Sequence, residues 1–292
     1  MKRRPTRNQR TCLFLLITLT AFIIIYLSPS VWGQKTYKVA ILPEYLPIVI
    51  YEKFDPLLEY LKRELDVNFE LIIPKNFNEH MQMIKNGTVD FSYQNPYVVL
   101  ELSPYIQPLV ITEKGKKWGI EGRGVIIAKA DGGITKPDDL VGKRVSIVSF
   151  HSADGYIAQK NFLKGMMINV NTDYKVYETN INLHVNVMED VLRKNADAGF
   201  LCEELFTDPD SVSSISAEDL DFKSINIIAR TSYIPNWIFS ARKNMKPAFI
   251  NEVKKVLLNI PIDSEVLKAA KIRRFVQIPS NYLEEYRSKN EP

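Results

Sequence analysis

VDFSYQNPY, residues 89–97, predicts a strand that passes within about two residues into a helix. Its first five residues have the apolar and aromatic character of a short buried strand. Asn95 is a favourable N-cap, and Pro96 suits the first turn of a helix. Ligands of open α/β sheets bind just beyond the carboxyl ends of the strands. Tyr93 and Gln94, which lie at this junction, therefore indicate the wall of a binding pocket rather than a catalytic device.

Strands and helices alternate on both sides of this junction. The periodicity predicts strands at Tyr37–Leu42, Phe69–Ile73, Val89–Tyr93, Ile106–Ile111, Arg123–Lys129, Arg144–Val148, Tyr174–Tyr177, Ala198–Leu201, Ile225–Ala229 and Trp237–Ala241. It predicts helices or helical turns at Tyr51–Leu65, Asn78–Lys85, Pro96–Leu102, Lys136–Leu140, Ala153–Lys164, Leu183–Lys194, Pro247–Asn259, Ser264–Ile272 and Asn281–Arg287. This alternation is typical of an α/β protein with mixed, mainly parallel sheets flanked by helices.

The chain is too long for a single five-stranded unit, and its βα alternation falls into two blocks, before and after about residue 125. We therefore expect two lobes with a ligand cleft at the hinge. Residues 34–125 together with 235–292 are expected to form lobe 1, and residues 126–234 lobe 2. Two chain crossings between the lobes are expected to form the hinge.

The first 33 residues read as an export signal. Basic residues precede the uncharged apolar stretch 12–27, and small residues follow Pro29 up to Gly33. This order is typical of a secretory signal peptide cleaved after Gly33. An uncleaved membrane anchor is the alternative, because the uncharged stretch 11–34 is long enough to span a bilayer, although Pro29 interrupts it. Both interpretations place the folded part in the periplasm, as a soluble or an anchored protein.

The charge of the chain is concentrated in this leader. The formal net charge is +4, but without the first 33 residues 33 basic residues face 34 acidic ones, a net charge of −1. The basic isoelectric point therefore indicates no nucleic-acid partner. Cys202 is the single cysteine of the expected mature chain, so no internal disulfide forms.

Several segments resemble, in order, the phosphonate-binding family of periplasmic substrate-binding proteins of ABC transporters. These are VAILPEY (39–45), DPLLEYLKREL (55–65), KNGTVDFSYQNPY (85–97), RGVIIAKADGGITKPDDLVGKRVSIV (123–148), SADGY (152–156), KNADAGFLCEEL (194–205) and YIPNWIFSARKNM (233–245). The resemblance covers nearly all of the expected mature chain at compatible spacings. Each segment alone is weakly specific, whereas the ordered set is specific for the fold and the general role.

The resemblance implies a two-lobed class II binding fold that closes on a small ligand, such as a phosphonate, a related oxyanion or a zwitterion. A membrane permease would be the partner of such a protein. Some relatives instead report a ligand to a sensor kinase, and this role stays open as the alternative. No cofactor is implied, and a monomer is expected.

The resemblance also suggests residues that line the cleft. Tyr45 and Tyr93 match positions where aromatic side chains face the ligand, since a ring supplies contact area and its hydroxyl can donate to an oxyanion. Both rings could equally be packing residues. Asn236 lies at an expected crossover, where it is placed to touch the ligand.

The entry of the helix after residue 151 departs from the family pattern. Relatives place consecutive hydroxyl side chains there, so that an anion meets hydroxyl groups and the free N–H groups of the first turn. Ser152 matches the first hydroxyl, whereas Ala153 and Asp154 do not match the next two. A carboxylate at this place repels a dianion, or caps the helix and nothing else. His151, if protonated, would restore positive character.

Two further candidates lie in the second lobe. His184 occupies a place where relatives often have a histidine facing the ligand, although it is also consistent with a polar residue at a helix start. Glu203 follows the strand at 198–201, near family positions whose acidic residues meet a ligand amine. A carboxylate at this place is equally consistent with a residue of the first helical turn, where the helix dipole favours a negative charge.

An enzyme is not expected. The residue types of a hydrolase or a thiol enzyme are present, namely Ser152, Asp154, His184 and Cys202. No nucleophile elbow or paired acid and base accompanies them. His80, His151 and His184 are not closely spaced, so a metal centre is not expected either.

Overall fold

The computed structural model describes residues 35–209 and 221–290, except for the side chains of Lys116 and Lys117. The expected leader, cleaved or anchored, lies outside the described residues. Within the described ranges, no helix is long and apolar enough to cross a membrane. Residues 36–292 cluster as one compact unit.

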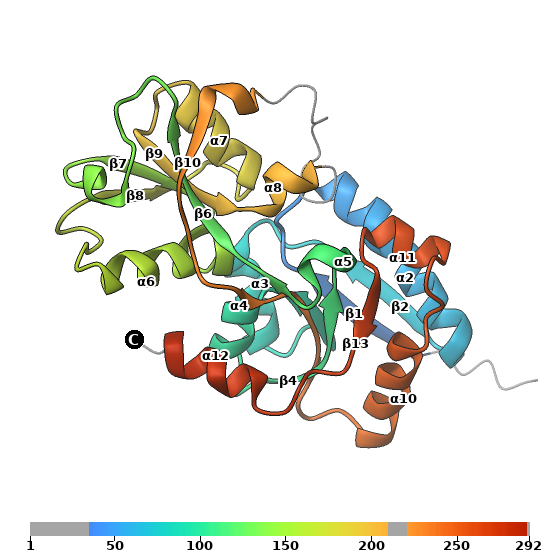
Figure 1. The fold of residues 1–292 in the computed structure, drawn as a ribbon. Helices are drawn as coiled ribbons and strands as arrows, with labels where there is room; N and C mark the ends of the chain where they lie inside the picture. Colours follow the sequence, from blue (N-terminus) through green and yellow to red (C-terminus); the bar gives the residue numbers. More distant parts are fainter. Residues whose placement is uncertain (1–34, 210–220, 291–292) are drawn as a thin grey trace, which may run out of the picture. The chain divides into compact units, whose positions relative to one another are not determined.

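A six-stranded mixed sheet gathers strands from the two ends of this unit (Figure 1). Its order is β13-β4-β12-β3-β1-β2, with β1 at Thr36–Ile41, β2 at Asn68–Ile72, β3 at Phe91–Gln94, β4 at Ile106–Glu113, β12 at Ile238–Arg242 and β13 at Arg274–Val276. The helices of this part are α2 (Pro47–Leu65), α3 (Phe77–Lys85), α4 (Pro96–Glu101), α10 (Pro247–Leu258), α11 (Glu265–Ala270) and α12 (Tyr282–Asn290).

The middle of the chain forms a second, five-stranded mixed sheet. Its order is β10-β6-β9-β7-β8, with β6 at Gly124–Lys129, β7 at Arg144–Ile147, β8 at Lys175–Glu178, β9 at Ala198–Cys202 and β10 at Ile225–Arg230. The helical elements here are η1 (Pro137–Leu140), η2 (Ala153–Ile157), α6 (Ala158–Gly165), α7 (His184–Leu192), α8 (Glu204–Thr207) and η4 (Phe222–Ser224). α7 packs against β9, β6 and β7.

The chain crosses between the two sheets twice, and the crossings pair with each other. The first crossing runs through α5 (Gly115–Trp118) and β5 (Glu121–Gly122), and the second through β11 (Ile234–Pro235). β5 and β11 form a two-stranded antiparallel ribbon. β6 begins at Gly124, two residues before the expected boundary of lobe 2. The exact lobe boundaries remain a prediction.

Local sequence signals explain where the elements begin. Asn95 caps α4 through its Oδ1, which accepts from the Val98 N–H (3.0 Å), and Pro96 occupies the first turn. Asn76 caps α3 in the same way, accepting from the Glu79 N–H. All four residues of β3 are buried, as the apolar run predicts for a central strand.

The mixed α/β architecture is confirmed, but antiparallel pairing is more frequent than the alternation predicts. β12 runs antiparallel to both β3 and β4, β13 is antiparallel to β4, and β6 is antiparallel to β9 and β10. β6 and β12, the strands that follow the two crossings, run opposite to the neighbours with which they pair. The periodicity also misses the short elements α5, α8 and β13, which contain too few residues to show a period.

Candidate functional site

A small pocket lies where the carboxyl ends of β3, β4 and β9 meet the two crossings and the start of η2. Its lining contains three carboxylates, two cations and two indole rings. The lining residues are Asn95, Pro96, Lys114, Trp118, Glu121, Gly122, Arg123, Ala153, Asp154, Cys202, Glu204, Ile234, Pro235, Asn236 and Trp237. The volume open to the centre of a water molecule is about 20 Å³, little more than one water molecule requires. Both sheets therefore approach each other closely here.

The turn that begins at Ser152 holds one side of this pocket. Ser152 is the N-cap: its Oγ accepts from the Gly155 N–H (3.1 Å) and donates to Glu44 Oε1 (3.4 Å). The Ile157 N–H donates to the Ser152 carbonyl, five residues back, which makes the first turn a π turn. A Cβ at Gly155 would lie 2.7 Å from Ser152 Oγ, so only glycine leaves room for this cap. The expected continuous helix from Ala153 therefore starts with a π turn.

Asp154 does not cap the helix, because Ser152 does so. Asp154 Oδ1 is buried and accepts no hydrogen bond from the described residues. Its nearest ion-pair partner is His184 Nε2, at 3.7 Å. The carboxylate lines the pocket. The interpretation that Asp154 is only a cap is therefore wrong.

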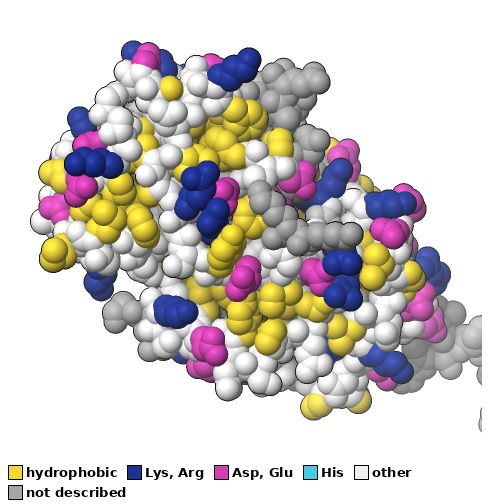
Figure 2. All heavy atoms as spheres, in the orientation of Figure 1, with side chains coloured by type: hydrophobic (Ala, Val, Ile, Leu, Met, Phe, Trp, Pro, Cys, Tyr) yellow, Lys and Arg dark blue, Asp and Glu magenta, His cyan; other side chains and the backbone are white. Residues whose placement is uncertain are grey.

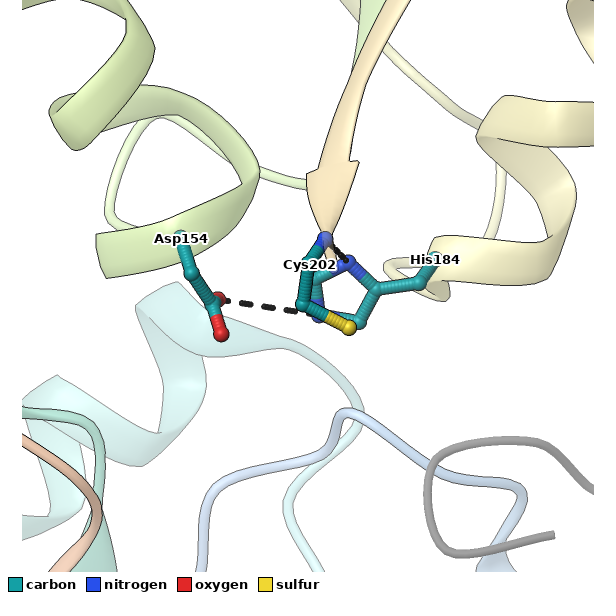
Figure 3. Close-up of side chains that lie close together, drawn as sticks. All are labelled: Asp154, His184 and Cys202. Carbon is teal, nitrogen blue, oxygen red and sulfur yellow. Dashed lines mark hydrogen bonds and ion pairs between the residues drawn. The ribbon is translucent and has the colours of Figure 1, made fainter. Parts of the chain in front are cut away.

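His184 lies at the start of α7 and faces Asp154 and Cys202 (Figure 3). The Cys202 backbone N–H donates to His184 Nδ1 (3.1 Å). Because a backbone amide can only donate, Nδ1 carries no proton in this arrangement, and Nε2 carries it. Nε2 lies 3.6 Å from Glu44 Oε2 and 3.7 Å from Asp154 Oδ1, so its N–H is directed at two carboxylates.

The proton affinities of this cluster reflect its burial. Burial raises the pKa of Asp154 to about 6, although His184 opposes the shift, and Glu44 adds to it. Burial lowers the pKa of His184, whereas Cys202, Glu44 and Asp154 raise it; the Cys202 N–H directed at Nδ1 holds the ring in its neutral form, with the proton on Nε2. Burial also raises the pKa of the Cys202 thiol, which disfavours a reactive thiolate.

Asp154, His184 and Cys202 present donor atoms within 4.8 Å of one another, close enough to suggest a metal site. The tautomer argues against it. Nε2 would need its lone pair to bind a metal, which would move the proton to Nδ1 and set it against the Cys202 N–H. As arranged, His184 is a hydrogen-bond donor and not a metal ligand.

Glu203 lies beside the pocket but not in its lining. Its carboxylate accepts from Arg123 Nη2 (3.0 Å) and from Arg230 Nε (2.7 Å), and Arg123 Nε also donates to it. Burial raises the pKa of Glu203, but the two guanidinium groups more than offset this and hold it below its usual value. The neighbouring Glu204 lines the pocket and forms an ion pair with Lys114, which follows β4. This pair joins the two sheets.

Tyr93 and Tyr45 line a second small pocket, together with Lys53, Phe54, Lys114, Trp237, Ala270, Lys271 and Ile272. Tyr93 lies within an aromatic cluster with Phe54 and Trp237, and its hydroxyl shares a hydrogen bond with Thr112 Oγ1 (2.7 Å). The Tyr45 ring faces Lys53 Nζ at 3.9 Å. Lys114 and Trp237 border both pockets, so Tyr93 supports the wall of the first pocket through Trp237.

His151 and Asn95 connect the two sheets at another edge of the site. His151 Nδ1 lies 2.7 Å from Glu101 Oε2, at the end of α4, and Asn95 Nδ2 donates to the His151 carbonyl (3.1 Å). His151 is not part of the pocket lining. Asn236 is: its Oδ1 accepts from the Trp237 N–H (2.9 Å), which fixes the second crossing.

The structure thus brings Ser152, Asp154, His184 and Asn236 together, with Tyr45, Tyr93, His151 and Glu203 around them. Sequence reasoning passed over Lys114. It follows the carboxyl end of β4, so the strand-end rule that selected Tyr93 could also have selected it.

The His151–Glu101 pair should hold the two sheets together. For a ligand that binds between the two sheets, we expect Glu101→Gln to weaken binding about two- to five-fold, the effect of a partly exposed ion pair, because a contact between the sheets is lost. Calorimetric titration measures the affinity. Glu265→Gln, which breaks the exposed Glu265–Lys268 pair within α11, should leave it unchanged. Equal affinities of wild type and Glu101→Gln would show that the pair does not stabilise closure.

Two mixed sheets joined by paired crossings, with a polar pocket at the strand ends between them, define a two-lobed periplasmic binding protein. The family model described as "ABC transporter, phosphonate, periplasmic substrate-binding protein" matches residues 39–282. The chain therefore belongs to the phosphonate-binding family of these proteins, and the family expected from the sequence is confirmed.

Solved structures confirm the fold. PhnD1 from Prochlorococcus marinus, in complex with methylphosphonate, has a TM-score of 0.74 at 16% identity, over 87% of this chain and 97% of that one. XAC2383 from Xanthomonas citri, bound to ATP, has a TM-score of 0.74 at 18% identity, over 87% and 96%. A binding protein component of an ABC phosphonate transporter from Pseudomonas aeruginosa has 0.74 at 12% identity, over 88% and 86%.

A sensor protein is similar in sequence. The chain is 24% identical over 223 residues to the tetrathionate sensor histidine kinase TtrS of Salmonella typhimurium. The match covers 71% of this chain and 37% of the kinase, so the chain spans little more than a third of this curated relative.

Proposed function

We propose that this protein is an extracytoplasmic solute-binding protein that captures a small polar ligand between its two lobes and presents it to the permease of an ABC importer. The observation that carries the proposal is the pocket built from both sheets, whose polar groups converge where the strands end. Asp154, Cys202 and Glu204 come from the second sheet, and Asn95 and Lys114 from the first. Such a site binds and orients a ligand.

The geometry supports capture by closure. Glu44 follows β1 in the first sheet, and it reaches Ser152 and His184 in the second. The Lys114–Glu204 and His151–Glu101 pairs cross the same interface. The lobes separate at the β5–β11 ribbon to admit a ligand, and they close around it across the same interface. A partner that binds only the closed form then distinguishes the ligand-bound protein from the free one.

Binding rather than catalysis follows from the same contacts. Ser152 Oγ is held by Gly155 and Glu44, and it has no hydrogen bond to His184 that would activate it as a nucleophile. The Cys202 thiol is buried and its pKa is raised. We therefore assign no reaction to the site.

The protein acts in the periplasm as a monomer on this proposal, without a nucleic-acid partner. The cleaved leader is favoured over an anchor, and the mature chain then begins at Gln34. On the face shown in Figure 2, basic and acidic side chains are interspersed among hydrophobic ones rather than gathered in a basic stripe. N-terminal sequencing of the exported protein tests the leader: Met1 or Lys2 at the start would establish an anchor.

Ligand binding should change the emission of Trp118 and Trp237, which line the pocket. We expect at least one member of a panel of phosphonates, oxyanions, zwitterions and amines to shift the fluorescence and to make the protein more compact in solution scattering. Glu44→Gln should weaken this response, since Glu44 joins the two sheets, whereas Glu265→Gln should not. A panel without any response in either measurement would refute the proposal.

The similarity to the tetrathionate sensor kinase favours one alternative. The same cleft would then report its ligand to the extracellular domain of a membrane sensor kinase. Cross-linking in cells that carry both candidate partners distinguishes the two roles. Capture of a permease supports import, and capture of a kinase supports sensing.

A further inference from the structure

We propose that the pocket selects a ligand that carries an ammonium group, and that Asp154 receives this group. The inference rests on the proposed function, because it names the class of ligand for the same pocket. It starts from the Asp154 carboxylate, which lines the pocket while its buried Oδ1 accepts no hydrogen bond from the described residues.

Asp154 has no structural task that would explain this placement. Ser152 caps the turn, and the Asp154 backbone carbonyl, not its side chain, accepts from Gln159 Nε2 (2.6 Å). The His184 N–H lies 3.7 Å away, beyond hydrogen-bond distance. A buried carboxylate oxygen without a donor is costly. A ligand that supplies N–H donors and positive charge removes that cost.

The charges around the pocket leave an excess of acid. Lys114 is paired with Glu204, and Arg123 with Glu203. Asp154 and Glu44 share His184 as their neighbouring donor. The buried Glu44 and the partly buried Asp154 therefore face one imidazole. A cationic ligand group would balance this charge, whereas an anion would add to it.

The helix entry offers little to an anion. An anion at the start of η2 would need the Ser152 hydroxyl as a donor, but that hydroxyl donates to Glu44 and its oxygen accepts from Gly155. It would also meet the Asp154 carboxylate directly. Where relatives are expected to hold an anion, this chain presents an acceptor.

The aromatic lining favours an organic ammonium over a bare metal ion. Trp118 and Trp237 border the same space as Asp154, and the faces of indole rings attract ammonium groups and also pack against their alkyl substituents. The proton on His184 Nε2 excludes this nitrogen as a metal ligand in the arrangement described. We therefore infer an alkylammonium group rather than a divalent cation.

Two matched pairs of probes test the inference by calorimetry. 2-Aminoethylphosphonate differs from ethylphosphonate by its ammonium group, and choline differs from 3,3-dimethylbutan-1-ol by its charge. We expect the charged member of at least one pair to bind wild type at least ten-fold more tightly than its matched partner. Asp154→Asn, which keeps the shape of the side chain, should abolish that difference. The control Asp139→Asn changes a carboxylate that is held outside the pocket by Thr135, so it should preserve the difference.

The outcomes separate this inference from the proposed function. Binding of ethylphosphonate or other oxyanions without a preference for the ammonium compounds would overturn the inference and leave the solute-binding role intact. An ammonium preference that persists in Asp154→Asn would overturn the role of Asp154. Failure of every ammonium, phosphonate and oxyanion probe to bind would overturn both.

Discussion

Asp154→Asn raises the stability of the ligand-free protein at pH 7.5 by about 1–3 kcal/mol. Burial raises the pKa of Asp154 to about 6 from a usual value of 3.8, and a shift of this size is worth about 3 kcal/mol. Asparagine removes the charge while it keeps the shape of the side chain. A substitution that stabilises the fold while it weakens binding is typical of a residue retained for its ligand.

The pH dependence of this gain has a definite sign. Because the folded-state pKa of Asp154 is raised, the wild type is spared the burial cost below about pH 3.8, and it incurs that cost as the pH rises through 6. The groups that face Asp154 are His184, Glu44, Lys114, Cys202 and Tyr286. The advantage of Asp154→Asn should therefore be small near pH 4 and reach its full size above pH 7.

Urea denaturation at several pH values measures this gain. Asp139→Asn is the matched control, since the Asp139 carboxylate accepts from the Thr135 N–H (2.8 Å) and its loss should destabilise the protein. If Asp154→Asn is destabilised like this control at pH 7.5, the Asp154 carboxylate has a stabilising partner in the free protein. The inference of an uncompensated charge would then be wrong.

Local signals were sufficient to predict most elements of the fold. The junction at residues 89–97 is one example: Asn95 caps α4 and Pro96 begins it, as expected. Both features depend on residues adjacent in sequence. The antiparallel entry of β12 between β3 and β4 could not be predicted in this way, because it depends on how a strand about 130 residues later returns to the sheet.

The site shows the same division between local and long-range information. The place of Asp154 in the first turn of a helix could be predicted from its neighbours. That Ser152 would cap this turn and leave Asp154 Oδ1 without a partner depends on side-chain geometry. The link from Glu44 to His184 joins residues 140 positions apart in different sheets, and no periodicity contains it. The orientation of Tyr93 toward Phe54 and Trp237 likewise depends on tertiary packing.

His80 should make a contribution to stability that is lost in acid. Its side chain is fully buried on α3, where Nε2 lies 3.3 Å from Gln94 Oε1, and the Gln94 amide donates to Ser240 Oγ. Burial lowers the pKa of His80 to about 4, although the Gln94 hydrogen bond opposes this. The unfolded chain therefore binds a proton that the folded chain does not, and the contribution of His80 to stability falls by about 3 kcal/mol as the pH drops from 6.5 to 4.

His80→Gln keeps a donor near Gln94 and removes the titrating group. We expect this variant to be no more stable than wild type at pH 7.5. By pH 4 its free energy of unfolding should have risen relative to wild type by up to about 3 kcal/mol, as measured by urea denaturation. His151→Gln, at a partly exposed histidine, should keep the pH profile of wild type. A constant difference between His80→Gln and wild type at every pH would show that His80 is not buried in its neutral form.

The expected effects of His80 and Asp154 have opposite signs over nearly the same pH range. Acid removes the burial cost of Asp154 while it imposes one on His80, since one group is buried as an acid and the other as a base. The wild type should therefore change little from these two groups between pH 4 and 6. The stability of the double variant should be equally independent of pH. The stability of Asp154→Asn should fall as the pH drops, and that of His80→Gln should rise. Single variants that tilt the same way would contradict one of the two assignments, and comparison with the double variant identifies which.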